Sequence, residues 1–256
     1  MKLFPVNKIL LFVFIIFSPL ISLADEHDAL VREANDLYSR GEYQEAGLLY
    51  DSVINLGFES GELYYNLGNS YFKQNKITDA IINFERALLL TPEDKDIKYN
   101  LSLANNLVLD NIDELPVLFI NTWLQNLINM FSSIIWSIFS VTSFIILIIL
   151  GLIYFFSARR ILKKISFLTA IFCLFLSIST FIFASVQNNK ITKRETAIIY
   201  SPSVTMKSSP DESGTDLFLL HEGTKIQVID SLGDWREIKL SDGNKAWLKY
   251  SDIVII

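Results

Sequence analysis

The sequence predicts a multidomain membrane protein made of an all-α helical-repeat domain, a two-helix transmembrane hairpin and a small all-β domain. Three observations predict this architecture. A helical pattern of 34 residues lies at 61–94, two long uncharged stretches cover 134–156 and 166–186, and short β-rich runs alternate with turn residues over 196–256. The composition agrees, because 51% of the residues are hydrophobic and the mean hydropathy of +0.35 is too high for an ordinary soluble protein.

Residues 1–24 have the features of a secretory signal peptide. Lys2 and Lys8 give a positive start, an apolar run follows, and small residues precede a cleavage position after Ala24. An uncleaved membrane anchor is the alternative. Both interpretations place residue 25 outside the cytoplasm.

The strongest repeat signal covers residues 61–94. Small residues at Gly68, Ala80 and Ala87 let two antiparallel helices approach closely, and aromatic residues fill the space beside them. Pro92 cannot continue the second helix and marks the turn to the next unit. The positions that match the tetratricopeptide-repeat pattern are Tyr64, Leu67, Gly68, Tyr71, Ala80, Phe84, Ala87 and Pro92.

A weaker copy of the same pattern covers residues 27–60. Ala34 and Ala46 stand where the stronger repeat has small residues. Residues 95–110 begin a third unit but do not complete it, so we expect a capping helix that covers the last apolar face. The sequence therefore predicts tetratricopeptide repeats and a cap over 25–112.

The predicted repeat domain is strongly acidic. From Asp25 to Pro116 there are 18 acidic and 7 basic residues. A solvated acidic surface explains this balance, and a basic partner is the alternative. The whole chain has a formal net charge of −6, which argues against nucleic acid as a partner.

The first helix of each tetratricopeptide unit lines the concave face of the stack, where we expect a partner protein to bind. Asn side chains can hold a peptide backbone through paired donor and acceptor groups, and Tyr supplies contact area. The alternative is that these residues only pack or face water. The candidate positions are Asn35, Tyr38, Tyr65, Asn66, Asn69, Phe72, Lys73, Tyr99 and Asn100.

The middle of the chain predicts a membrane hairpin. Residues 116–133 carry no charge and include Trp123, which favours a helix lying at the membrane interface. The stretches 134–156 and 166–186 are each long enough to cross about 30 Å of hydrocarbon. The loop between them, 157–165, contains four basic residues and belongs on the cytoplasmic side. Both flanking domains are then extracytoplasmic.

After a linker at 187–195, residues 196–256 predict a β-domain. Asp242-Gly243 between two β-rich runs is a favoured tight-turn pair and predicts a hairpin. The order of strands and turns resembles a bacterial SH3-like domain, and the resemblance implies a barrel of five strands. Trp235 and Trp247 are candidates for a surface that stacks on a glycan or peptide; the alternative is that they anchor the core.

The sequence contains no catalytic constellation, so we expect a protein that is not an enzyme and holds no cofactor or metal. His27 and His221 lie in different predicted domains, and neither belongs to a metal-ligand spacing. Cys173 lies in the second apolar stretch, where a thiol behaves as a small apolar filler.

The order of secretory start, tetratricopeptide units, membrane hairpin with a basic loop, and terminal SH3-like domain resembles the BatE proteins of Bacteroides-type aerotolerance operons. The resemblance implies a two-pass protein of the bacterial inner membrane with both soluble domains in the periplasm. It also implies action beside von Willebrand A-domain membrane proteins and a MoxR-type ATPase. We expect a scaffold whose repeats bind a partner protein. The alternative is a cell-wall anchor whose SH3-like domain holds peptidoglycan.

Overall fold

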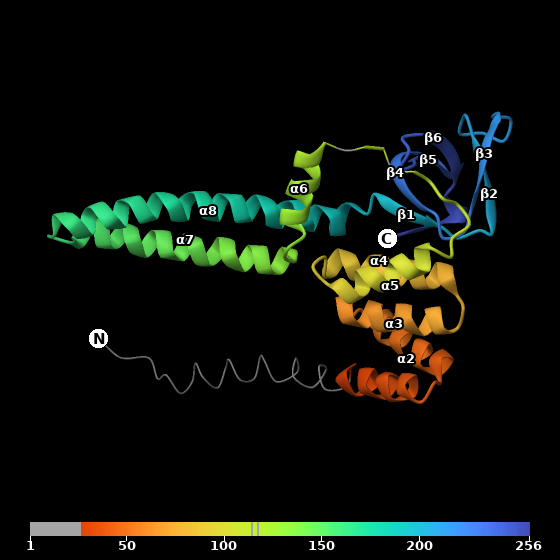
Figure 1. Cartoon of the computed structure of the whole chain (residues 1–256), viewed down its shortest axis with the longest axis horizontal. Helices are drawn as coiled ribbons and strands as arrows, with labels where there is room; N and C mark the ends of the chain where they lie inside the picture. Colours follow the sequence, from red (N-terminus) through yellow and green to blue (C-terminus); the bar gives the residue numbers. More distant parts are fainter. Residues whose placement is uncertain (1–26, 114, 117) are drawn as a thin grey trace, which may run out of the picture.

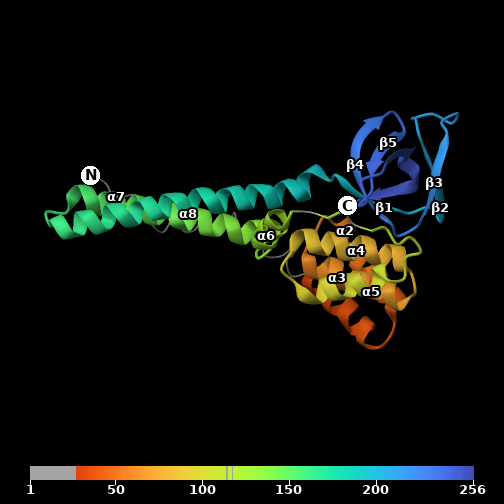
Figure 2. The same cartoon turned by 45° about the horizontal axis from the view of Figure 1, so that its top comes forward.

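The computed structural model describes residues 27–113, 115–116 and 118–256. The predicted signal peptide, 1–24, lies outside these residues. Figure 1 shows a stack of helices, a β-sheet beside it and a long helical hairpin that projects from both. The stack and the sheet lie together at the same end of the hairpin (Figures 1 and 2).

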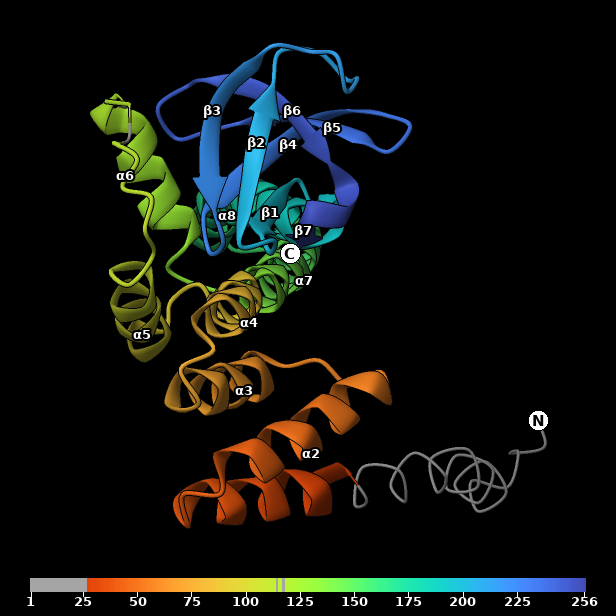
Figure 3. The same cartoon turned by 90° about the vertical axis from the view of Figure 1, so that its right-hand side faces the viewer.

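The stack is built of consecutive antiparallel helices that follow one another towards the sheet (Figure 3). Two helices begin at side-chain caps. The Ser60 hydroxyl accepts a hydrogen bond from the backbone N–H of Leu63 at 3.0 Å, and Asp94 caps the last helix in the same way. The helices of the stack are residues 27–39, α2 (Tyr43–Asn55), α3 (Gly61–Lys73), α4 (Ile77–Leu90) and α5 (Lys95–Asn105).

Small residues bring these helices into close contact, as the sequence predicts. Ala34, Ala46 and Ala80 are fully buried. Gly68 of α3 lies against the ring of Phe84 in α4, and a Cβ atom at this glycine would be only 2.7 Å from two ring carbons. The strong repeat and its weaker copy therefore use small residues for the same purpose.

The capping helix is shorter than predicted, because α5 ends before the close of the expected range 95–110. The chain after α5 instead runs along the sheet. Ile112 packs against the core of the sheet, and the N–H of Leu115 donates to the carbonyl of Ser241 at 3.0 Å. A helix extended through this segment would withdraw its backbone donors from the sheet.

The hairpin consists of α7 (Ser133–Phe156) and α8 (Arg160–Lys193), which are long and apolar enough to cross a membrane. Two buried serines join the helices through reciprocal bonds. The Ser140 hydroxyl donates to the carbonyl of Ser177 at 3.0 Å, and the Ser177 hydroxyl donates to the carbonyl of Ser140 at 3.1 Å. These bonds hold the two helices in register.

The predicted loop 157–165 and linker 187–195 are corrected, because most of both ranges is helical. Only 157–159 interrupt the hairpin, and α8 continues to Lys193. Long unbranched basic side chains are good helix formers, so Lys163 and Lys164 extend the apolar helix instead of ending it.

A short helix, α6 (Phe119–Ile128), lies across the end of the hairpin within the predicted interfacial segment 116–133 (Figure 1). The indole N–H of Trp136 donates to the carbonyl of Ile128 at 2.8 Å. The buried amide of Gln187 donates to the same carbonyl at 3.4 Å. Residues of both hairpin helices therefore satisfy the C-terminal end of α6.

Within the described part of the chain, seven strands form one open antiparallel sheet in the order β3-β2-β6-β5-β4-β1-β7, not the five strands expected. The predicted hairpin at Asp242-Gly243 is confirmed, since Ile238 pairs with Ala246 and Gly243 has a φ of 90°. The strands are β1 (Thr196–Ile199), β2 (Ser203–Lys207), β3 (Asp216–His221), β4 (Lys225–Leu232), β5 (Trp235–Lys239), β6 (Lys245–Lys249) and β7 (Ile253–Ile255).

The sheet packs directly on the helical stack. Ile198 of β1 is fully buried in the same core cluster as Ile81 of α4. Charged groups join the two parts beside this core, where Lys225 Nζ lies 2.7 Å from Glu85 Oε2. The Glu85 side chain is buried, so the ion pair is partly shielded from water. The stack and the sheet therefore form one body (Figure 2).

Candidate protein-binding surface

Asparagine pairs connect the first helices of successive units. In the first pair, the Asn66 amide donates to Asn35 Oδ1 at 3.3 Å. The hydroxyl of Tyr50 donates to the same oxygen at 2.5 Å. Burial raises the pKa of Tyr50 to about 12, so this hydroxyl stays protonated and remains a donor at neutral pH.

The second pair repeats the arrangement one unit further along the stack. The Asn100 amide donates to Asn69 Oδ1 at 2.8 Å and to the hydroxyl of Tyr65 at 3.0 Å. Asn35 is exposed, and the other three asparagines are half-buried. We call the set the asparagine row; it consists of Asn35, Asn66, Asn69 and Asn100.

The asparagine row keeps hydrogen-bonding capacity that its internal contacts do not use. Each amide offers two N–H donors and an oxygen with two lone pairs. Asn66 Oδ1 accepts no hydrogen bond from the residues that the structure describes, and the Asn69 amide donates none to them. A peptide backbone carries a donor and an acceptor on nearly every residue, and it suits such a surface.

The other predicted positions on the first helices differ in exposure. Tyr99 is 64% exposed, next to Asn100 in the row. Lys73 is also exposed, and Tyr38 lies edge-on to Tyr43 with ring centroids 5.1 Å apart. Phe72 packs against the core of the stack instead. The structure therefore gives Phe72 a packing role and leaves Tyr99 available for contact.

Trp235 and Trp247 lie on the outer face of the sheet. Cross-strand pairing places Trp235 opposite Lys249 and Trp247 opposite Lys207, while Ile238 points to the buried side. Both tryptophans are half-buried and stand outside the buried core of the sheet. The structure thus supports a surface position for the two indoles rather than core anchoring.

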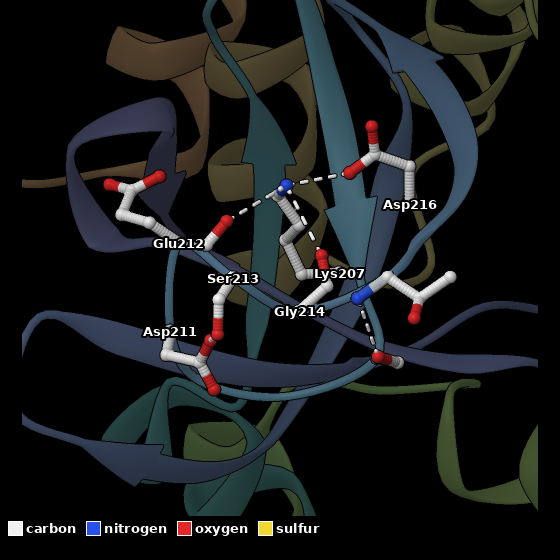
Figure 4. Close-up of polar contacts among 8 residues, drawn as sticks. Lys207, Asp211, Glu212, Ser213, Gly214 and Asp216 are labelled. Carbon is white, nitrogen blue, oxygen red and sulfur yellow. Dashed lines mark hydrogen bonds and ion pairs between the residues drawn. The ribbon is translucent and has the colours of Figure 1, made fainter.

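The loop between β2 and β3 curves around the side chain of Lys207 (Figure 4). Lys207 Nζ lies 2.6 Å from Asp216 Oδ1 and donates to the carbonyls of Glu212 and Gly214 at 3.3 Å each. The Glu212 carboxylate forms an ion pair with Lys249. The ammonium group of Lys207 thereby fixes the conformation of the loop.

The structure also contains a polar cluster between the stack and the sheet that was not predicted from the sequence. Asp110 accepts from the N–H of His221 at 2.6 Å and from the hydroxyl of Thr224 at 2.7 Å, and its other oxygen lies 2.8 Å from His221 Nδ1. Burial opposes ionisation of Asp110, but these hydrogen bonds outweigh it and hold the pKa below its usual value. No local pattern signals this cluster, because Asp110 is more than a hundred residues away from His221 and Thr224 in the chain.

In the described residues, no group of three or more His, Cys, Asp or Glu side chains is arranged to hold a metal ion. A cavity of about 590 Å³ lies between the end of α5 and the sheet, lined mainly by amide, hydroxyl and lysine side chains. The polar surfaces of this body are therefore suited to recognition through hydrogen bonds.

Comparison with protein families agrees with the geometry of the stack. The tetratricopeptide repeat family matches residues 61–94, which comprise α3, α4 and the turn that follows. This segment is therefore a tetratricopeptide repeat, and the helical part of the chain is a repeat domain of the kind that serves protein–protein interaction. No match to the chain was found among curated proteins.

Proposed function

We propose that this protein is a non-enzymatic scaffold of the cell envelope that binds a partner protein along the asparagine row. The observation that carries the proposal is the row itself, which spans successive first helices and retains unused donors and acceptors. Tyr99 extends the row with an exposed aromatic side chain. Tyrosine offers a large contact area at a small cost in side-chain entropy.

We also propose that α7 and α8 cross a membrane. Only 11% and 22% of their most apolar windows are buried inside the protein, whereas a core helix of a soluble protein would be mostly buried. Exposed hydrocarbon on this scale needs lipid around it. Because the stack and the sheet meet at the same end of the hairpin, they share one side of the membrane.

We assign that side to the periplasm of a bacterial inner membrane. The secretory start and the basic residues at the opposite end of the hairpin support this orientation. The order of segments supports a BatE-like protein with an SH3-like terminal domain. Von Willebrand A-domain membrane proteins of the same operon are then the proposed partners.

Site-specific crosslinking tests the docking surface. A photoreactive residue at Tyr99 is compared with one at Leu48 of α2, a second helix of a unit, because both side chains are 64% exposed. We expect one dominant crosslinked protein from Tyr99 and none from Leu48 in intact cells. Equal crosslinking at both positions, or none at Tyr99, contradicts the proposal.

Peptidoglycan anchoring is the second candidate, and the surface position of Trp235 and Trp247 favours it. Half-buried indole rings at the surface, beside lysines, suit a glycan that carries carboxylated peptides. Incubation of the purified protein with sacculi provides the test. Binding that disappears in Trp247→Ala, together with an absence of crosslinks at Tyr99, would favour the anchor over the scaffold.

A further inference from the structure

Helix α6 exposes a large apolar surface, and contact of such a surface with water is unfavourable. Its sequence carries no charge, and Phe119 and Trp123 are 84% and 62% exposed. Ile120 and Leu124 are also exposed. Side chains three and four positions apart lie on the same face of a helix, so these four residues form one apolar face, opposite a polar face that includes Thr122 and Gln125.

The position of α6 indicates what covers it. The helix lies across the hairpin at the end where α7 starts and α8 leaves its apolar stretch (Figure 1). Trp136 and Gln187 fix it there through the carbonyl of Ile128. If the hairpin spans a bilayer, α6 lies in the plane of the headgroups, and its surface is continuous with the lipid-facing surface of the hairpin.

A lysine sits at the corner between α6 and α8. Lys190 Nζ donates to Gln125 Oε1 at 3.0 Å and to Asn129 Oδ1 at 3.1 Å. Both acceptors are neutral, and no carboxylate pairs with Lys190 among the residues that the structure describes. A half-buried cation is thus positioned without a neutralising charge from the described protein.

We propose that this corner binds the phosphate of an anionic phospholipid headgroup, an inference that rests on the proposed membrane span. In this proposal the ammonium group of Lys190 contacts the phosphate, while the side-chain amide oxygens of Gln125 and Asn129 hold that ammonium group in position. Trp123 lies among the headgroups, where indole rings are favoured.

A lipid fits this surface better than a protein partner does. The apolar face of α6 is continuous with the apolar surface of the hairpin, and Lys190 lies at the edge of this face. A phospholipid has the same arrangement, because its apolar acyl chains end in a charged headgroup. A basic residue near an anionic membrane surface contributes about 1 kcal/mol, which corresponds to roughly a fivefold preference. We therefore expect selection by headgroup charge.

The full-length protein in detergent is titrated with phosphatidylglycerol or phosphatidylcholine, and bound lipid is counted by native mass spectrometry. We expect wild type to retain phosphatidylglycerol roughly fivefold better, and Lys190→Gln to lose this preference. Lys239→Gln removes an exposed lysine on the sheet and serves as the matched control, with the preference unchanged.

Other results overturn the inference. Equal retention of the two lipids, or loss of preference in Lys239→Gln as well, shows that the corner does not recognise the headgroup. Displacement of the lipid by millimolar inorganic phosphate shows a site for free phosphate instead. Reconstituted protein is also washed with alkaline carbonate: release from vesicles overturns the membrane span and the lipid site together, whereas retention without headgroup preference overturns the lipid site alone.

Discussion

Replacement of Gly68 by alanine tests the close approach of α3 and α4. The added Cβ atom would lie 2.7 Å from two carbons of the Phe84 ring and 3.3 Å from the carbonyl oxygen of Ala80. The Phe84 ring is fully buried among the core residues of the stack. The helices must therefore separate or the ring must leave its preferred rotamer.

The magnitude follows from two opposing effects. Overpacking of a well-filled core costs about 1–3 kcal/mol. Alanine is better than glycine in a helix by about 0.5–1 kcal/mol, which offsets part of that cost. We expect Gly68→Ala to destabilise the repeat by about 1–2 kcal/mol. Gly47→Ala in α2 is the control, because its nearest neighbour would lie at 3.5 Å and only the helix benefit remains.

Hydrogen–deuterium exchange of the full-length protein in detergent measures both variants. A loss of one or two kcal/mol accelerates exchange of protected amides in α3 and α4 by about 5–30-fold. Gly47→Ala should slow exchange in α2 slightly. Unchanged exchange in Gly68→Ala, or the same acceleration in both variants, would refute the argument that close helix contact requires glycine at this position.

Three further predictions concern contacts between parts of the chain. Asp110→Ala should weaken the contact between stack and sheet by about 2–4 kcal/mol, because the N–H of His221 and the buried hydroxyl of Thr224 lose their acceptor; unchanged amide protection at His221 would contradict this. The Asp110 pKa is lowered in the folded protein, so its stabilising effect is present above the unfolded pKa of about 4 and is lost as pH falls through the lowered value. The protection factor of the His221 amide should fall in that window, and Asp110→Asn should remove the pH dependence. In the hairpin, Ser140→Ala and Ser177→Ala should each destabilise the helix pair by about 0.6 kcal/mol by steric trapping in detergent, and the two losses should add, because each hydroxyl donates to a backbone carbonyl that the other substitution leaves in place; no effect of either change would mean that the serines do not bond across the helices.

Local patterns predicted the elements whose causes are local. The small residues of the strong repeat, at Gly68, Ala80 and Ala87, are spaced by helix geometry, and the structure places helices where that spacing requires them. The turn at Asp242-Gly243 is equally local, because the dipeptide itself favours the backbone conformation. These predictions needed no knowledge of the rest of the chain.

The ends of elements depend on distant partners, and the sequence was a poorer guide to them. α8 continues past its apolar stretch because Gln187 and Lys190 contact α6 and the turn after it. α5 ends early because the following segment bonds to the sheet. The hydrogen bond between Asn69 and Asn100 lies between these two cases. The repeat pattern predicted that both residues lie on the concave face of the stack, but it did not predict that they bond to one another.

Helix α8 is longer than a bilayer is thick. The helix has 34 residues, or about 51 Å, whereas the hydrocarbon core of a bilayer is about 30 Å thick. Only residues 194 and 195 separate α8 from β1, so the sheet and the stack cannot turn freely about its end. If α8 spans a bilayer as proposed, a change of about 10° in the tilt of such a rod moves its tip by about 9 Å, mainly parallel to the membrane plane. Local bilayer thickness, acting on the tilt of one helix, would thereby shift the docking surface sideways over the membrane.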